Sequence, residues 1–381
     1  MIKTDSILLE HSQAKVEIYK RYLGKYLNIL SRTPYVTKIY LFDLMCGEGV
    51  YKDGQKGSCI ATIDTILSHY KNNNNTCPNI EIWFNDKGQS TIDEGKTKVE
   101  RVEHLIKQSE ISIPYNVHIE YYNKDYNEII KTVIDKTNLL KRDERCLTFI
   151  DPYGYKDIRP EELKSLSINE KTEIFLFLPI NLMWRFATHS LSASDFYGGE
   201  ALKKLIYELF PNHKTLRFET QTVFIEELKL KLKQYTSFRY CTSFIIERQK
   251  GIFYSLFIFT NNKKGYEKIV ETKWDFDKEN GKGFRHISLA NQQQGSFFGG
   301  TVEISNYSQM VYDYILSRKN VSNQELFDFG LENEHLPSHT NVVLNALKKE
   351  SRISVEALDG LPVKGNYIED KHERKVNFKL K

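Results

Sequence analysis

A glycine-bearing loop directly after an apolar run is the stretch of this chain best suited to bind a ligand. Residues 40–54 read YLFDLMCGEGVYKDG, in which the apolar run ends at Asp43 and is followed by Gly47 and Gly49. Glycine lets a ligand or a second backbone segment approach the main chain closely, and it adopts left-handed conformations without strain. Glycines after a strand are also common in ordinary turns, so the loop alone leaves its ligand open.

Two phosphate-binding interpretations of the loop fail on spacing. The dinucleotide fingerprint G-x-G-x-x-G needs a third glycine where this chain has Lys52. A P-loop needs G-x-x-x-x-G-K-[ST], which neither CGEGVYKDG nor DGQKGS supplies. S-adenosylmethionine (SAM) carries no phosphate; its site needs backbone close to the amino-acid end, and carboxylates that accept hydrogen bonds from an ammonium group and ribose hydroxyls. We expect such contacts from Asp43, Cys46, Gly47, Glu48, Gly49 and Tyr51.

Acidic residues also lie at the ends of the next two apolar runs. Asp86, followed by Lys87, ends IEIWFND, and Asp125, followed by Tyr126, comes soon after NVHIEYY. Open α/β sheets bind ligands at the carboxyl ends of their strands. Asp86 with Lys87 is therefore expected at the ribose, and Asp125 with Tyr126 at the adenine amine and ring. The alternatives are a turn or capping role for Asp86 and an N-cap role for Asp125.

A fourth strand end, FIDPYGYKD, carries the candidate acceptor site. Asp151 directly before Pro152 ends the strand, and Tyr153-Gly154 follows as a tight turn. Amine-directed methyltransferases use a related tetrapeptide, Asp/Asn-Pro-Pro-aromatic, whose polar groups accept hydrogens from the target amine while the ring stacks on the base. The aromatic residue is third here instead of fourth, so a purely structural turn stays open as the alternative.

The elements that would position these residues alternate along the chain. A helix predicted over residues 11–30, with Ser12 as a candidate N-cap, precedes apolar runs separated by helical stretches. The runs are followed by two β-rich segments within 238–262, joined by RQKG as in a hairpin. This layout is that of the class I SAM-methyltransferase fold, a Rossmann-like α/β sheet of parallel strands with a C-terminal antiparallel hairpin. The predicted strands are 38–44, 80–86, 116–122, 145–151 and 172–178, and the predicted helices lie near 58–71, 91–108, 126–137, 160–166 and 195–235.

The last part of the chain has a different pattern. Residues 276–302 are rich in glycine and glutamine and are expected to be a linker after a methyltransferase-like domain at 1–275, whose first 37 residues form an N-terminal helical segment. Residues 303–381 predict three helices and a strand, as in a winged-helix-like domain with 339–350 as recognition helix. A helical cap on the first domain is the alternative.

Composition excludes several classes of protein. Of 381 residues, 40% are hydrophobic and 27% charged, which is globular composition, and the net charge of +4 is too small to indicate a nucleic-acid binder by itself. The five cysteines form neither a disulfide framework nor a zinc motif, so no metal is expected. No apolar run is long enough to span a membrane and the N-terminus does not read as a signal peptide, so we expect a cytoplasmic protein without a membrane partner.

The motifs together resemble the three-Cys-motif partner protein (TcmP) family of SAM-dependent methyltransferases. That family's first motif reads D-G-F-A-G-P-G-R-Y-x-x-G-x-x-G-S and its fourth F-I-D-P-F-G-Y, which DLMCGEGVYKDGQKGS and FIDPYGY follow closely. Two departures are Leu44-Met45-Cys46 for Gly-Phe-Ala and Asp86 for the usual Glu. HSQAKVEIYKRYL is similar to the family's helical start, with Lys15 matching. The resemblance implies SAM as cofactor and a partner protein bearing a three-cysteine motif.

We therefore expect a SAM-dependent methyltransferase that acts on nucleic acid, on an amine of a base, together with a partner protein. One alternative is a catalytically silent protein of the same fold that holds nucleic acid or the three-Cys-motif partner. Another is a methyltransferase of a protein or small molecule. The sequence does not discriminate among the acceptors.

Overall fold

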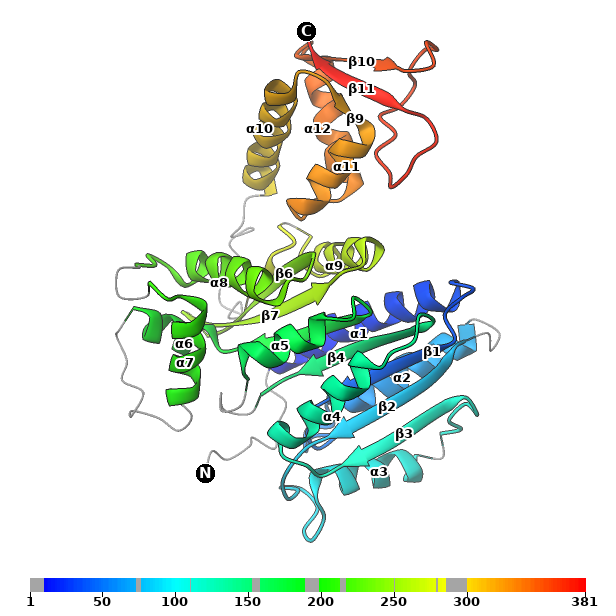
Figure 1. Cartoon of the computed structure of the whole chain (residues 1–381), viewed down its shortest axis with the longest axis vertical. Coiled ribbons are helices and arrows are strands. Elements are labelled where there is room, and N and C mark those ends of the chain that lie inside the picture. Colours follow the sequence, from blue (N-terminus) through cyan, green and yellow to red (C-terminus); the bar gives the residue numbers. More distant parts are fainter. Residues whose placement is uncertain are drawn as a thin grey trace. The chain divides into compact units, whose positions relative to one another are not determined.

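The computed structural model describes most of the chain in two compact units, each considered by itself. The N-terminal unit is Met1–Ile269 with Gly283–His286, and the C-terminal unit is Val270–Lys282 with Ile287–Lys381 (Figure 1). The described residues are 10–72, 77–109, 111–152, 158–188, 199–212, 217–249, 251–278, 280–285 and 300–381.

A mostly parallel sheet forms the centre of the N-terminal unit. Its strand order is β3-β2-β1-β4-β5-β7-β6-β8. Strands β1 to β5 pair in parallel, whereas β7 is antiparallel to both of its neighbours. This order confirms the class I SAM-methyltransferase fold with its C-terminal antiparallel hairpin. The strands are β1 (Lys38–Asp43), β2 (Asn79–Asn85), β3 (Val117–Tyr122), β4 (Glu144–Ile150), β5 (Thr172–Leu178), β6 (Tyr240–Gln249), β7 (Ile252–Thr260) and β8 (Gly283–Arg285).

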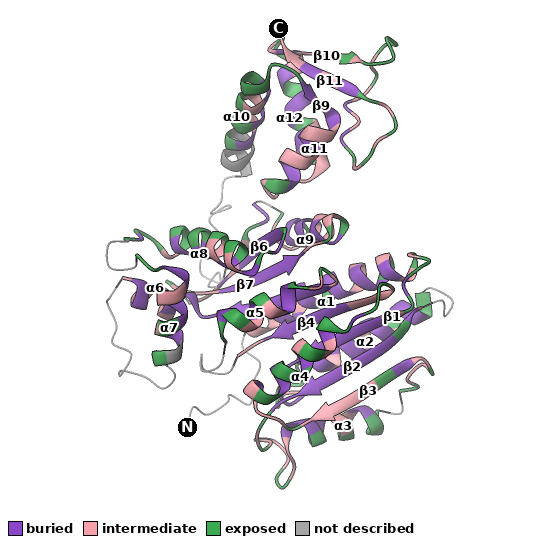
Figure 2. Ribbon diagram, viewed as in Figure 1, coloured by how far each residue is buried: buried purple, intermediate pink, exposed green. Residues whose placement is uncertain are grey.

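The inner strands are buried on both faces, which explains their nearly continuous apolar sequences. Every residue of β5 is buried, as are all but the first of β1 (Figure 2). Side chains alternate between the faces: Phe149 packs against Tyr19 of the first helix, whereas Phe42 lies in the cluster beneath the helices of the other face. The face to which Phe149 points also receives Asp151, two residues further on.

The helices of this unit largely follow the predicted positions. Ser12 lies inside α1 instead of capping it. The third helix begins at Lys98 instead of near 91, because Thr97 and Glu100 form a capping box there. The helices are α1 (Glu10–Ser31), α2 (Ser58–Asn72), α3 (Lys98–Gln108), α4 (Tyr126–Asn138), α5 (Pro160–Ser167), α6 (Ile180–Ala187), α7 (Gly199–Leu209), α8 (Gln221–Thr236) and α9 (Lys263–Phe276).

The long helical region predicted at about 195–235 consists of two helices in the described residues. Helix α7 ends at Leu209, just before Pro211, and α8 begins after Thr220, whose side chain accepts a hydrogen bond from Val223 N at 3.2 Å. The short α6 directly after β5 was not predicted, because its sequence INLMWRFA continues the apolar run of the strand.

The C-terminal unit has the winged-helix arrangement that the sequence predicts. It contains three helices and a small antiparallel sheet of order β10-β11-β9, in which β9 lies between the first and second helices in the chain. Helix α12 occupies the position of the predicted recognition helix. Its core contains Tyr307, Val343, Leu347 and Phe378. The bounds are α10 (Gly300–Arg318), β9 (Val321–Ser322), α11 (Asn323–Glu332), α12 (Pro337–Lys349), β10 (Ile353–Ala357) and β11 (Val376–Leu380).

The division between the units falls inside α9, and the end of this helix packs within the C-terminal unit. Lys273 forms an ion pair with Glu334, and Trp274 Nε1 donates to Glu334 O at 2.7 Å. The Trp274 ring also meets His339 edge-on, with centroids 4.2 Å apart. Among the helices so described, none is long and apolar enough to cross a membrane.

Candidate active site

The glycine loop after β1 lies at the carboxyl edge of the sheet, where its conformation depends on its glycines. Gly47 and Gly49 have φ values of +70° and +82°. A Cβ added at Gly49 would lie 3.2 Å from both Val102 and Leu105, so α3 packs directly onto this glycine. Further along, Tyr51 is half-buried and its N–H donates to Gln55 O at 2.9 Å, closing a turn. Gly49 therefore allows the loop and α3 to meet.

Asp43 is a buried carboxylate whose hydrogen bonds are incomplete. Ser58 Oγ donates to its Oδ2 at 2.5 Å, but no donor among the described residues bonds its buried Oδ1. Burial, with the negative charges of Asp151 and Asp86, raises the pKa of Asp43 to about 7, although hydrogen bonding from Ser58 and from the backbone N–H of Met45 acts to lower it. The structure thus brings the ends of β1, β2 and β4 together. One buried acceptor oxygen there, Asp43 Oδ1, has no donor among the described residues.

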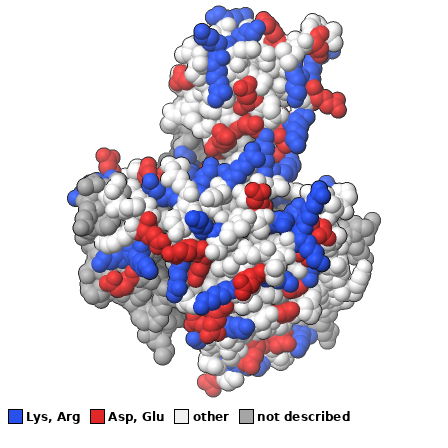
Figure 3. All heavy atoms as spheres, in the orientation of Figure 1, with Lys and Arg blue, Asp and Glu red and all other residues white. Residues whose placement is uncertain are grey.

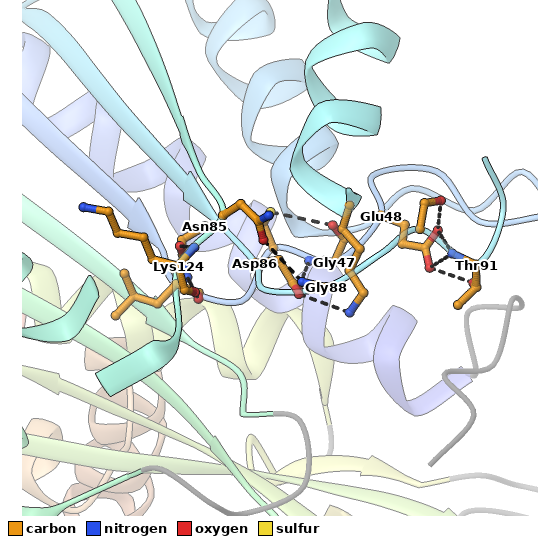
Figure 4. Close-up of polar contacts among 12 residues, drawn as sticks. Gly47, Glu48, Asn85, Asp86, Gly88, Thr91 and Lys124 are labelled. Atoms are coloured by element: carbon orange, nitrogen blue, oxygen red, sulfur yellow. Dashed lines mark hydrogen bonds and ion pairs between the residues drawn. The ribbon is translucent and has the colours of Figure 1, made fainter. Parts of the chain in front are cut away.

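Asp86 ties the end of β2 to the glycine loop. Its Oδ2 accepts from Gly47 N at 2.9 Å and its Oδ1 from Lys98 Nζ at 3.1 Å (Figure 4). Both side chains of the Lys98 ion pair are less than a tenth exposed. Burial raises the pKa of Asp86 above its ordinary value, although Lys98 and Gly47 act to lower it. Each oxygen already has one partner, so a ribose would have to share these acceptors with Lys98 and Gly47.

Asn85, beside Asp86, was not singled out from the sequence. Its Nδ2 donates to Leu44 O at 2.9 Å and to Lys124 O at 3.2 Å, while its Oδ1 accepts from Lys124 N at 3.0 Å. Its carbonyl accepts from Cys46 N at 2.9 Å. One amide therefore joins the ends of three strands, as Figure 4 shows. The available signal was a polar residue at the end of the otherwise apolar run IWF, immediately before Asp86.

Two loop residues expected at the cofactor have their polar groups occupied inside the protein. The Glu48 carboxylate accepts from Thr91 N and Oγ1 at 2.7–3.1 Å and from Ser90 Oγ at 2.8 Å. Burial acts to raise the pKa of Glu48, but the bonds from Thr91 and Ser90 and the charge of Lys98 hold it below its ordinary value. Cys46 is fully buried, and burial raises the pKa of its thiol. Glu48 thus anchors the loop after β2.

At the end of the third strand, Asp125 has the N-cap role that the sequence left open as an alternative. Asp125 caps α4, since its Oδ1 accepts from Asn127 N at 3.1 Å. Its Oδ2 accepts from Lys87 Nζ at 3.0 Å, and this bond, with that from Asn127, lowers the pKa of Asp125. Tyr126 is 4% exposed and packs in the hydrophobic cluster under α4. It therefore lacks the open face that stacking on an adenine ring requires.

Asp151 at the end of β4 meets a residue from the far N-terminal part of the chain. Lys15 of α1 donates to Asp151 Oδ2, and its Nζ also lies 4.5 Å from the centroid of the Phe177 ring. The side chains are 8% and 19% exposed. Pro152 follows Asp151 directly, whereas Tyr153 and Gly154 lie outside the described residues. The sequence marked Lys15 only as part of a family motif, because a contact across 136 residues leaves no local signal.

The described part of the chain contains no group of three or more His, Cys, Asp or Glu side chains that could hold a metal ion. The carboxylates of Asp43, Asp86 and Asp151 form a mixed polar cluster with Lys15, which pairs with Asp151, and Lys98, which pairs with Asp86. Such a cluster can bind a ligand that carries an ammonium group and hydroxyls, and can orient an amine.

One comparison with known proteins identifies a domain of this chain, and the solved structures that match are remote. Residues 288–360 match the family model described as GMT-like wHTH domain, a winged helix-turn-helix. No curated protein matches the chain significantly. A Legionella pneumophila protein of DUF519 is 12% identical, with a TM-score of 0.39 over 71% of this chain and 91% of that one. A DUF574 protein from Streptomyces avermitilis is 7% identical, with a TM-score of 0.29 over 64% and 83%. Loganic acid methyltransferase with SAH is 8% identical, with a TM-score of 0.27 over 69% and 98%.

Proposed function

We propose that this chain is a SAM-dependent methyltransferase that acts on nucleic acid, at an amine of a base. The observation that carries the cofactor assignment is the unpartnered buried Oδ1 of Asp43 beside the glycine loop. A buried acceptor without a donor is costly, and an ammonium group from a ligand would relieve that cost. The strand order of the sheet supports the same assignment, because ligands bind at this edge in open α/β sheets.

The residues present fit SAM in the following roles. Asp43 would accept from the ammonium group, with Cys46, Gly47 and Gly49 forming the backbone beside it. Asp86 would accept from the ribose hydroxyls, and Asp125 with Lys87 would border the adenine. Bound SAM supplies an electrophilic methyl group. The chain's own contribution is alignment, since methyl transfer depends mainly on holding the acceptor in line with the methyl carbon.

Asp151 is the residue that we propose to orient the acceptor. Its carboxylate would accept a hydrogen from the target amine, and Lys15 fixes its position through the Oδ2 contact. Pro152 follows Asp151 directly, and Tyr153 and Gly154 would form the rest of the site that binds the acceptor. The winged-helix unit supports nucleic acid as the substrate class, because this fold places one helix in the major groove.

Calorimetric titration with SAM tests the cofactor assignment. Losing a hydrogen bond to a charged group costs about 1.5–3 kcal/mol, so Asp43→Asn should weaken SAM binding by about 10- to 150-fold. Asp135→Asn is the matched control, since Asp135 is an exposed carboxylate on α4. Equal affinities for wild type, Asp43→Asn and the control would refute the role of Asp43, and absence of binding to the wild type would refute the cofactor.

Transfer of radiolabelled methyl groups tests the acceptor. Purified DNA, RNA and a co-expressed partner are each incubated with labelled SAM and wild type, Asp151→Ala or the control Asp135→Ala. We expect label in nucleic acid with wild type and control, and at least tenfold less with Asp151→Ala, in line with loss of a group that positions a reactant. Label in the partner protein alone would replace nucleic acid by protein as the acceptor.

One observation favours a second candidate, a protein that binds SAM and nucleic acid without turnover. The Asp151 carboxylate is already engaged by Lys15, so it is less available to an amine than a free carboxylate would be. In this case SAM would bind stoichiometrically and no acceptor would be labelled. The resemblance to the TcmP family supports a three-Cys-motif protein as partner in either role, which co-purification with such a protein would test.

A further inference from the structure

A basic surface groove lies between α1 and α2, and the site residues described above take no part in its lining. Its volume is about 660 Å³. Three cationic residues of α1, Lys20, Arg21 and Lys25, line it together with Arg32, which directly follows the helix, against the single carboxylate of Asp64. The face of the molecule in Figure 3 mixes both signs of charge.

The two acidic residues near these cations reduce the groove's positive charge only in part. Asp64 is paired with Lys56 at 2.6 Å, outside the lining, and Glu17 is paired with Arg21 at 2.8 Å. In the part of the chain that the structure describes, Lys20 and Arg32 have no carboxylate at ion-pair distance, and both are exposed. The groove therefore presents at least two cations that no carboxylate of the described residues pairs with.

The remaining lining consists mostly of hydrogen-bond donors. Asn28, Ser68 and Asn72 contribute amide and hydroxyl groups. No Phe, Tyr or Trp is present among its described lining residues, so the groove offers no ring on which a base could stack. His69 lies at its edge, with Nε2 2.9 Å from Ser31 Oγ. This combination suits phosphate oxygens better than bases or apolar groups.

The cations are spaced along one side of α1. From Lys20 to its last residue, Ser31, the helix rises about 16 Å, and Arg32 follows directly; one strand of a duplex carries about five phosphates over this axial length. The same helix carries Lys15, which contacts Asp151, and the rise from Lys15 to Lys20 is only about 8 Å. A nucleic-acid strand held along the groove would therefore be fixed to the helix that reaches the acceptor site.

We propose that the α1–α2 groove binds the phosphate backbone of a nucleic acid, independently of base sequence. The proposal rests on the proposed function, which it deepens by assigning a docking surface for the substrate on the N-terminal unit. Phosphate contacts of this kind supply affinity and orientation, while the sequence is read elsewhere.

The test compares two variants of the full chain that lose the same charge. Lys20→Gln/Arg32→Gln removes two groove cations that have no carboxylate at ion-pair distance among the described residues. Lys131→Gln/Lys233→Gln removes two exposed lysines of α4 and α8, outside the lining. Binding to fluorescent mixed-sequence DNA and RNA duplexes is measured by anisotropy across a salt series. Each lost phosphate contact lowers the salt slope by about 0.9, so the groove variant should lose about 1.8 from the slope and about tenfold in affinity at moderate salt. The control should bind as the wild type does.

Two further measurements separate the outcomes. SAM titration should give the same affinity for both variants and wild type. If wild type binds and methylates a duplex and the groove variant binds it equally well, the groove proposal is wrong and the proposed function stands. If wild type binds SAM but no duplex, both the groove and nucleic acid as substrate class are wrong. Saturable binding of AMP or inorganic phosphate that is lost in the groove variant, without duplex binding, would also overturn the proposal, because the phosphate source would then be a free ligand.

Discussion

At the scale of single residues, Asp43 shows how a buried carboxylate makes the stability of the fold depend on pH. Burial raises the pKa of Asp43 from 3.8 to about 7. Near neutral pH the Asp43 carboxyl group of the folded chain is therefore partly protonated, whereas in the unfolded chain it is ionised and exposed to water. The unfolded state binds fewer protons between these values, and stability therefore falls as the pH rises from about 4 to about 7. A ligand cation would reverse the effect by favouring the ionised carboxylate.

This linkage predicts that Asp43→Asn flattens the pH dependence of unfolding. The interval from 3.8 to about 7 corresponds to on the order of 4 kcal/mol for one group. The unfolding free energy of the variant relative to wild type should therefore be higher at about pH 8 than at about pH 4 by a few kcal/mol, measured by urea denaturation. Glu173, whose pKa burial also raises to about 7, contributes equally to both proteins and cancels. A difference that is the same at both pH values would contradict the burial of an ionisable Asp43.

The single residues that sequence could identify are those with a local motif. Gly47, Gly49 and Asp151 stand in recognisable patterns, whereas Asn85 and Lys98 act through partners that sequence distance conceals. Asp125 shows that a residue in a local motif can still have two possible roles. The same position in the chain suits a ligand contact and an N-cap, and only the geometry of α4 shows that its carboxylate caps the helix.

At the scale of elements, α3 and the glycine loop support one another, which Gly49→Ala tests. At Gly49 φ is +82°, and an added Cβ would lie 3.2 Å from Val102 and Leu105. At Gly54 φ is +79°, but an added Cβ would have no neighbouring atom within 4 Å. Both alanine variants carry about 1–2 kcal/mol of backbone strain, and crowding adds about 1–3 kcal/mol at Gly49 alone. Urea denaturation should therefore rank Gly49→Ala clearly below Gly54→Ala. Equal losses would show that α3 moves away without cost.

Helix α1 is attached to the end of β4 by the Lys15–Asp151 ion pair, and a double-mutant cycle measures this attachment. Removing one partner leaves a largely buried charge unpaired, so Lys15→Met and Asp151→Asn should each cost about 1–3 kcal/mol. The double variant should cost less than their sum by about 1–2 kcal/mol, because neither charge is then left alone. Strict additivity in urea denaturation would mean that the two side chains do not interact in solution.

The positions of strands were easier to predict than those of helices, for a physical reason visible in particular elements. Strands such as β5 are buried on both faces and read as apolar runs bounded by polar residues. The start of α3 depends on the Thr97–Glu100 capping box and Gly95, which compete with a helical pattern that begins earlier. Helix α6 is as apolar as the strand before it, so periodicity could not separate the two.

At the scale of the whole molecule, the two units have separate cores, and in each unit one tryptophan packs on the core or donates a hydrogen bond within it. Trp274 belongs to the C-terminal unit through Glu334 and His339, and Trp184 packs on the core of the N-terminal unit, with Nε1 donating to Phe218 O at 3.1 Å. Replacing such a ring by alanine costs about 3–5 kcal/mol where the site cannot collapse. Because local opening follows cooperative units, the cost should appear only in the unit that holds the ring.

Native-state hydrogen exchange on the full chain tests this separation with two matched variants. Trp274→Ala should raise exchange in α10, α11 and α12 and leave β1 to β5 unchanged, whereas Trp184→Ala should do the reverse. The magnitude expected from about 3 kcal/mol is a factor of roughly 100 in the exchange rates of the most protected amides of the affected unit. Faster exchange throughout the chain in both variants would mean that the units unfold as one. Stabilities measured for the methyltransferase-like unit could then no longer be interpreted apart from the winged helix.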